Sequence, residues 1–192
     1  MTETTTVIDA MFNVGAHFGY SRARRHASVR SHLFGAKNGV DIINLEETAK
    51  MLAAAEERIR ELGKLGKPVV FVGTKMEVRP LVEAAAKSLN QPYVTERWVG
   101  GMLTNWPEIR KRTNRLKELT DKFAKGELEK YTKKERLLFE REMAKLNTEF
   151  GGIVSLEGTP AALVIVDPRE EHIAVLEAIK MKVEIISLLN TD

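Results

Sequence analysis

The sequence predicts an α/β fold in which a doubly wound parallel sheet carries an inserted antiparallel coiled-coil helical hairpin. Short continuous apolar runs are typical of strands buried on both faces, and amphipathic segments lie between them. Residues 106–150 break this alternation with a long, charge-rich stretch of weak β-propensity, which predicts the hairpin. With 192 residues, 43% of them hydrophobic, the chain is long enough to bury a core.

The clearest predicted strand is Val69–Val72, an apolar and mostly β-branched run, and Ala161–Val166 repeats its pattern. Further strands are predicted at Val40–Leu45, Pro92–Thr95 and Val183–Leu189, and helices at Glu46–Leu62, Val78–Leu89 and Glu170–Lys180. Strands that alternate with helices imply right-handed crossovers and a sheet covered on both sides, as in Rossmann-like and flavodoxin-like folds.

Two amphipathic helices are predicted within residues 106–150. Apolar residues recur at helical spacing in both, as Ile109, Leu116, Leu119 and Phe123, and then Phe139, Met143, Leu146 and Phe150. Each stripe is narrow, so the helices should fold back on each other as a coiled coil that projects from the sheet. We therefore expect residues 1–105 and 151–192 to form the α/β domain, with 1–39 as a basic N-terminal extension and 106–150 as the hairpin insertion.

Net charge argues only weakly for a nucleic-acid partner, because 30 Lys and Arg oppose 27 Asp and Glu, leaving +3. The distribution of charge is more informative. Residues 10–40 contain no acidic residue but hold Arg22, Arg24, Arg25, Arg30 and Lys37. Clustered arginines are typical of phosphate contacts, although a solvated basic loop explains this segment equally well.

The sequence offers no complete catalytic motif. The turn Gly73-Thr74-Lys75 lacks the further glycines of a phosphate-binding loop, and there is no cysteine and no Gly-x-Ser-x-Gly motif. None of the four histidines has metal-ligand spacing to another: His17, His26, His32 and His172. Asp167-Pro168-Arg169 stands where open sheets bind ligands, but a helix N-cap explains it equally well. We predict no enzyme, cofactor, metal or small-molecule substrate.

Trp98 stands beside Arg97 and the pair Gly100-Gly101, which combines a flat ring, a charge and close backbone approach. Such a ring can stack on an RNA base, and it can equally be a core side chain beneath the base of the hairpin. The N-terminus has no secretory-signal pattern, and no apolar run approaches the roughly 20 residues of a membrane span. We expect a cytoplasmic protein with no membrane partner.

Several segments together resemble one known family. They are Gly15–Gly19, Phe34–Val40, Phe71–Lys75, Phe150–Ile153, Val164–Arg169 and, above all, Pro92–Asn105, which includes Glu96-Arg97-Trp98-Val99-Gly100-Gly101-Met102. In order and content they are similar to the bacterial small-subunit ribosomal protein two (S-two) family. The matches span nearly the whole chain and are specific as a set.

The resemblance implies an α/β domain with a protruding coiled-coil hairpin and a non-catalytic role in translation. It implies binding of small-subunit rRNA near the head–body junction, contacts with neighbouring ribosomal proteins, and help in attaching the first small-subunit protein (S-one). Family motifs and local charge together nominate an RNA-binding set: Arg22, Arg24, Arg25, Arg30, Lys37, Lys75, Arg97, Trp98, Asn105, Arg110, Lys111 and Arg112.

The sequence departs from the family at two places. After Gly19-Tyr20 many members have a Trp-Asn-Pro-Lys-like stretch, whereas this chain has Arg24–Val29, and we expect arginines to replace that RNA contact. Members also usually continue beyond the position of Asp192. Two alternatives stay open: a nucleotide-binding α/β enzyme, and a protein–protein scaffold that uses the hairpin and is indifferent to the loss of Arg22, Arg24 and Arg25.

Overall fold

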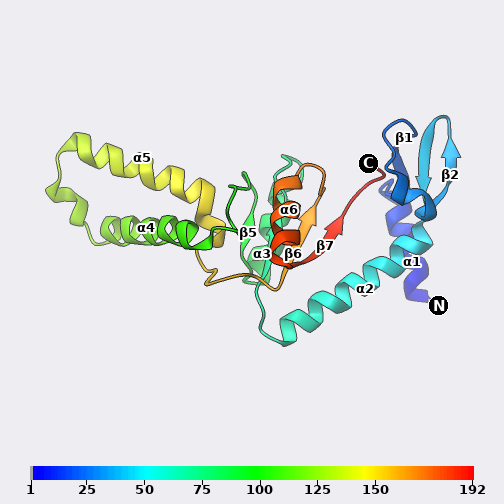
Figure 1. Ribbon diagram of the computed structural model, residues 1–192, viewed down its shortest axis with the longest axis horizontal. Coiled ribbons are helices and arrows are strands. Elements are labelled where there is room, and N and C mark those ends of the chain that lie inside the picture. Colours follow the sequence, from blue (N-terminus) through cyan, green and yellow to red (C-terminus); the bar gives the residue numbers. More distant parts are fainter. Residues whose placement is uncertain (1) are drawn as a thin grey trace. The chain divides into compact units, whose positions relative to one another are not determined.

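The computed structural model describes the backbone of residues 2–192 and the side chains of residues 7–192. The chain forms two compact units (Figure 1): an N-terminal unit of residues 1–66 with 189–192, and a central unit of residues 67–188. Met1, part of the predicted N-terminal extension, lies outside the described residues. The domain boundaries expected near residues 105 and 151 stay a prediction.

The N-terminal unit contains a three-stranded antiparallel sheet in the order β1-β3-β2. Its elements, in chain order, are α1 (Thr2–Asn13), β1 (Phe18–Ser21), the 3-10 helix η1 (Ala27–His32), β2 (Leu33–Lys37), β3 (Val40–Ile43) and α2 (Leu45–Lys64). The predicted helix at residues 46–62 is confirmed as α2. Asn44 caps it, because its side-chain oxygen accepts from the N–H groups of Glu46 at 3.0 Å and Glu47 at 3.4 Å.

A two-residue turn, Asn38-Gly39, joins β2 to β3. Both residues have positive φ, 52° and 79°, as in the turns that match the right-handed twist of paired strands. The strand predicted at residues 40–45 is confirmed over Val40–Ile43, but its expected place in the parallel sheet is wrong. The reason is this Asn-Gly turn, which pairs β3 with β2 in antiparallel register.

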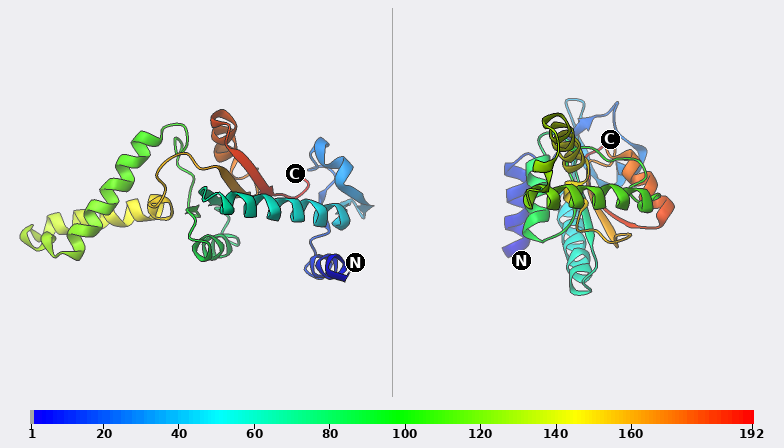
Figure 2. Two further views of the ribbon diagram at one scale, coloured as in Figure 1. Left: turned by 90° about the horizontal axis from the view of Figure 1, so that it is seen from below. Right: turned by 90° about the vertical axis from the view of Figure 1, so that its left-hand side faces the viewer.

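The central unit contains a four-stranded parallel sheet in the order β5-β4-β6-β7, which confirms the predicted parallel α/β arrangement. Its strands are β4 (Val69–Val72), β5 (Tyr93–Val94), β6 (Ala162–Val166) and β7 (Glu184–Leu188). The connection from β4 to β5 passes through α3 (Arg79–Ser88) and leads toward one edge of the sheet. The connection from β6 to β7 passes through α6 (His172–Met181) and leads toward the other edge. Right-handed crossovers therefore place α3 and α6 on opposite faces of the sheet, as Figure 2 shows.

Between β5 and β6 the chain forms α4 (Trp106–Ala124), the 3-10 helix η2 (Glu127–Lys130), α5 (Lys133–Phe150) and the 3-10 helix η3 (Gly151–Ile153). α4 and α5 run side by side (Figure 1), and the Arg115 Nε on α4 donates to the Glu142 Oε1 on α5 at 3.0 Å. Most of the predicted apolar stripe is buried or half-buried, but Phe123 is 53% exposed. The helix ends one residue later, and Leu128 of η2 is buried.

One apolar cluster links the sheet to the base of α4 and α5. Its buried members come from strands, helices and the intervening loops, and include Val72, Trp98, Leu116, Leu146, Phe150 and Ile165. Among the described residues no helix is long and apolar enough to cross a membrane.

Candidate nucleic-acid interface

Arginines of the acid-free segment in the N-terminal unit pair with acids that lie outside the segment. The Arg24 guanidinium donates to the Asp192 carboxylate at 2.6 Å and lies 4.0 Å from the ring centre of Tyr20. The Arg25 guanidinium donates to the Asp41 carboxylate at 3.3 Å, and the Asp41 side chain is completely buried. These two arginines therefore already have carboxylate partners, contrary to the expectation of a cluster with no acid nearby.

The remaining cations of this segment are exposed. Among the side chains of residues 7–192, those of Arg22, Arg30 and Lys37 form no ion pair with a carboxylate. The Arg22 N–H donates to the Gly39 carbonyl at 3.0 Å, which holds Arg22 beside the β2–β3 turn that follows Lys37. These three side chains are free to meet phosphate without first breaking an ion pair.

The last residues of the chain hold the basic segment in shape. The Thr191 hydroxyl accepts from the Tyr20 N–H, and the Thr191 carbonyl accepts from the His26 N–H, both at 2.8 Å. Thr191 is fully buried, and a Cβ at Gly19 would lie only 2.6 Å from its methyl carbon. Glycine is therefore required at position 19 for this close approach.

In the central unit, Lys75 lies at the carboxyl ends of the strands, where open α/β sheets bind ligands. Its ammonium contacts the Asp167 carboxylate. The preceding residue, Thr74, donates from its N–H at 2.8 Å and from its hydroxyl at 2.6 Å to the buried Glu171 carboxylate. The N–H that could hold a nucleotide phosphate therefore binds a carboxylate of the chain itself, which argues against the nucleotide-binding alternative.

The N-cap expected at Asp167 lies elsewhere. α6 begins at His172, with Glu171 as its N-cap residue, and Asp167 adopts a left-handed conformation with φ of 61°. Its carbonyl accepts from the Glu170 N–H at 3.1 Å, which forms a turn before the helix. The predicted start at residue 170 is therefore two residues early, because the Asp167-Pro168-Arg169 motif forms this turn.

Trp98 lies in the core, only 5% exposed, and its indole N–H donates to the Glu177 carboxylate at 3.4 Å. The core alternative is thus the one the structure adopts. A ring enclosed in this way has no free face for a base, so we leave Trp98 out of the set of direct RNA contacts. Arg97, next to it, is exposed.

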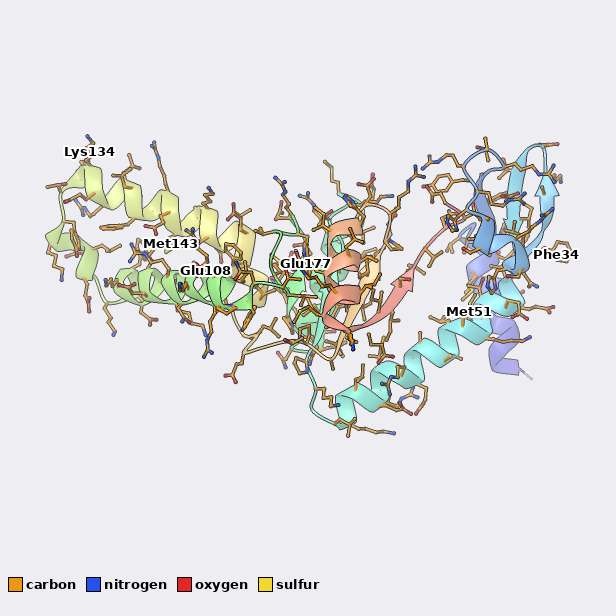
Figure 3. The ribbon with its side chains drawn as sticks, viewed as in Figure 1. Phe34, Met51, Glu108, Lys134, Met143 and Glu177 are labelled. Atoms are coloured by element: carbon orange, nitrogen blue, oxygen red, sulfur yellow. The ribbon has the colours of Figure 1, made fainter. Side chains whose placement is uncertain are left out.

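Glu177 is a buried carboxylate beside the candidate interface that no pattern in the sequence pointed to. It is 8% exposed and points from α6 toward the loop before α4 (Figure 3). Its carboxylate accepts from the N–H groups of Gly101 at 2.6 Å, Leu103 at 2.9 Å and Thr104 at 3.1 Å. Burial alone raises the pKa of Glu177, but these donors and the Trp98 indole outweigh it, so the pKa lies below its ordinary value.

Asn105, Arg110, Lys111 and Arg112 are exposed at the start of α4. Because Ile109 and Thr113 are buried, the three cations between them lie on the outward part of the helix. Lys111 pairs with Glu108 at 2.6 Å. Arg97 and Thr74 line one small cavity of about 150 Å³, so the loops that carry Arg97 and Lys75 lie close together.

No group of three or more His, Asp or Glu side chains in the described part of the chain could hold a metal ion. The fold and the exposed side chains define the class of protein: an α/β protein whose surface carries lysine and arginine side chains that form no ion pair among residues 7–192. The sequence model described as ribosomal protein S2 matches residues 11–192. The chain belongs to this family, so the resemblance seen in the sequence is confirmed.

Relatives of this chain carry the name small ribosomal subunit protein uS2. Those from Desulfovibrio desulfuricans, a Synechococcus species and Vibrio cholerae are each 41% identical to it over 182 residues. The alignments cover 95% of this chain and 70%, 68% and 75% of the respective relatives. The family is one of ribosomal proteins, and this membership confirms the prediction that the chain is not an enzyme.

Proposed function

We infer that this chain is a structural constituent of the small ribosomal subunit in the cytoplasm, where it binds rRNA and contacts neighbouring ribosomal proteins. The observation that carries the inference is the family match over residues 11–192. The exposed cations support it, because lysine and arginine side chains supply most contacts of proteins with the nucleic-acid backbone.

We propose that the RNA-contacting residues form two groups. In the N-terminal unit they are Arg22, Arg24, Arg25, Arg30 and Lys37, and in the central unit Lys75, Arg97, Asn105, Arg110, Lys111 and Arg112. Arg24, Arg25, Lys75 and Lys111 are ion-paired in this structure, so RNA must compete with carboxylates for them. We expect the unpaired cations to contribute more to affinity than these four.

Residues 106–150 are proposed to act as an antiparallel coiled-coil hairpin inserted into an α/β domain of residues 1–105 and 151–192. The buried stripe of α4 and α5 and the Arg115–Glu142 pair support this arrangement. The hairpin offers a long, exposed, charged surface that suits a contact with a neighbouring protein, and the first small-subunit protein is the partner we propose.

Cosedimentation of the tagged chain with ribosomal subunits from a cell lysate, repeated across a salt series, tests this function. We expect stoichiometric recovery with the small subunit and loss of the chain at high salt. Replacing Arg22, Arg30 and Lys37 together by Gln should release the chain at lower salt, because three phosphate contacts are removed.

The matched control replaces Lys50, Arg58 and Arg60 by Gln. It removes the same charge from the N-terminal unit, but each of these side chains pairs with a glutamate on α2. We expect this control to dissociate at nearly the salt of the unaltered chain. Recovery of the unaltered chain in the soluble fraction at every salt would contradict the proposed function.

A further inference from the structure

The turn between β2 and β3 places an asparagine directly before a glycine. Of all the asparagines in the chain, only Asn38 is followed by glycine. Glycine carries no Cβ, so nothing on that residue shields its own backbone nitrogen from the side chain that precedes it. The Asn38 side-chain carbon can therefore approach the Gly39 nitrogen more closely than it could approach that of any other residue.

Both residues of this turn are exposed. A Cβ built on Gly39 would meet nothing within 4 Å, so no other part of the chain hinders movement there. Among the side chains of residues 7–192, that of Asn38 takes part in no hydrogen bond. By contrast, the side-chain oxygens of Asn44 and Asn190 accept from backbone N–H groups. The Asn38 side chain is therefore free to rotate, whereas those two are held.

The backbone of the turn is also able to move. Lys37 and Val40 are the last paired residues of β2 and β3, so the turn lies at the tip of the paired strands. Loop tips open locally at little cost in free energy. The Arg22 N–H donates to the Gly39 carbonyl, which holds that carbonyl in place but leaves the Asn38 side chain unattached. Opening lets the Asn38 backbone rotate until its side-chain carbon meets the Gly39 nitrogen.

This approach permits a covalent step that needs only water. The Gly39 nitrogen loses its proton and bonds to the Asn38 Cγ, while the bond from Cγ to Nδ2 breaks. The Nδ2 nitrogen takes up a proton and leaves as ammonia, and a cyclic imide remains. Solvent water then opens the imide at either carbonyl, since its hydroxyl adds to the carbon and its proton goes to the nitrogen. The products are aspartate and isoaspartate.

We propose that Asn38 is a site of spontaneous deamidation in the folded chain. The reaction does not depend on the proposed function, because water is its only co-reactant. The new carboxyl group has an ordinary pKa of about 3.9, so it is ionised at neutral pH. Each modified chain loses one unit of its net charge of +3, next to Lys37 in the acid-free segment.

The isoaspartyl product also changes the backbone. Its main chain runs through the former side chain of residue 38 and so gains one carbon atom before Gly39. A two-residue turn joins its strands only at the standard backbone length. The pairing of Lys37 with Val40, and of Ala36 with Asp41, should therefore loosen in this product.

The test incubates the full chain at mildly alkaline pH, where the Gly39 nitrogen loses its proton more readily, and follows two peptides of one digest by mass spectrometry. The Asn38 peptide should gain the mass difference between water and ammonia, and a methyltransferase specific for isoaspartate should label it. The Asn90 peptide is the internal control. Asn90 is also exposed and has a positive φ of 51°, but Gln91 follows it, so its mass should stay constant.

The variant Asn38→Gly keeps a pair of residues that forms such turns and should abolish the mass gain. A sample unfolded in urea gives the rate of the reaction without the turn. The folded chain should convert no more than about tenfold more slowly, because loop tips open at little cost. Conversion of Asn38 only in urea would overturn the proposal, since the folded turn would then protect it. Equal conversion of Asn38 and Asn90, or a constant mass of both peptides, would overturn it as well.

Discussion

The Glu177 carboxylate accepts hydrogen bonds from three backbone N–H groups of one loop, those of Gly101, Leu103 and Thr104. This loop leads into α4, where the proposed RNA contacts Asn105 and Arg110 stand. A buried carboxylate is stable only when donors replace the water it has lost, and here the loop supplies them. Glu177 therefore fixes the path of the chain into α4.

We expect Glu177→Gln to lower the free energy of unfolding by about 2–3 kcal/mol near neutral pH, because the charge-assisted bonds are weakened and a buried donor loses its acceptor. Urea unfolding followed by circular dichroism measures this. Glu157→Gln, at an exposed loop position, is the control. An unchanged midpoint for Glu177→Gln would contradict the role of this carboxylate.

The same experiment has a defined pH dependence. The pKa of Glu177 in the folded chain lies below its ordinary value of 4.5, so its stabilisation is fully present above that value. It is lost as the pH falls through the folded-state pKa, where the carboxylate takes up a proton. The stability difference between the unaltered chain and Glu177→Gln should therefore shrink on acidification.

At the scale of elements, α4 and α5 show that only part of a predicted apolar stripe is buried. Leu119 is 1% exposed, whereas Phe123, four residues later in the same predicted stripe, is largely in solvent. The capping box of Thr132 and Glu135 starts α5, and donation from Thr132 lowers the pKa of the Glu135 carboxyl. Burial between the two helices, rather than apolar character alone, decides how much each side chain contributes to the stability of the fold.

Leu119→Ala should cost about 2–5 kcal/mol, since it leaves a cavity between the helices. Phe123→Ala should change stability by no more than about 0.5 kcal/mol, because little apolar surface is lost. Thermal unfolding followed at the helical circular dichroism band compares the two variants. Equal losses would mean that α4 and α5 do not pack as described.

At the scale of the whole molecule, the net charge of +3 does not distinguish the lysines and arginines that form ion pairs from those that do not. Many lysines and arginines pair with glutamates on the same helix, as on α2 and α4. Six proposed RNA contacts form no ion pair among the side chains of residues 7–192: Arg22, Arg30, Lys37, Arg97, Arg110 and Arg112. These six, and not the net charge, should determine the salt dependence of RNA binding.

We expect a plot of log affinity for rRNA against log salt concentration to have a slope of about −4 to −5, from six contacts at about −0.7 to −0.9 each. Filter binding across a salt series measures it. A slope near zero would show that the exposed cations do not meet phosphate.

Much of this protein could be predicted from local pattern. The buried strands Val69–Val72 and Ala162–Val166, the helix α2 and the alternation that makes a parallel sheet all follow from hydrophobic spacing, because burial on one or two faces leaves a periodic trace. The cations at Arg22, Arg30 and Lys37 were found because the segment lacks acids. The Asn38-Gly39 turn was a readable signal for the antiparallel hairpin, but the strand after it was assigned to the wrong sheet.

The sequence by itself determined the family, the parallel sheet and the two amphipathic helices, since these depend on residues close together in the chain. Only the tertiary structure decided that Asp192 pairs with Arg24, that Glu171 binds Thr74 and that Glu177 binds the loop at Gly101. These partners lie 168, 97 and 76 residues apart. Which carboxylate reaches which donor depends on how the sheet and helices bring distant segments of the chain together. A local sequence pattern does not predict which distant segments meet.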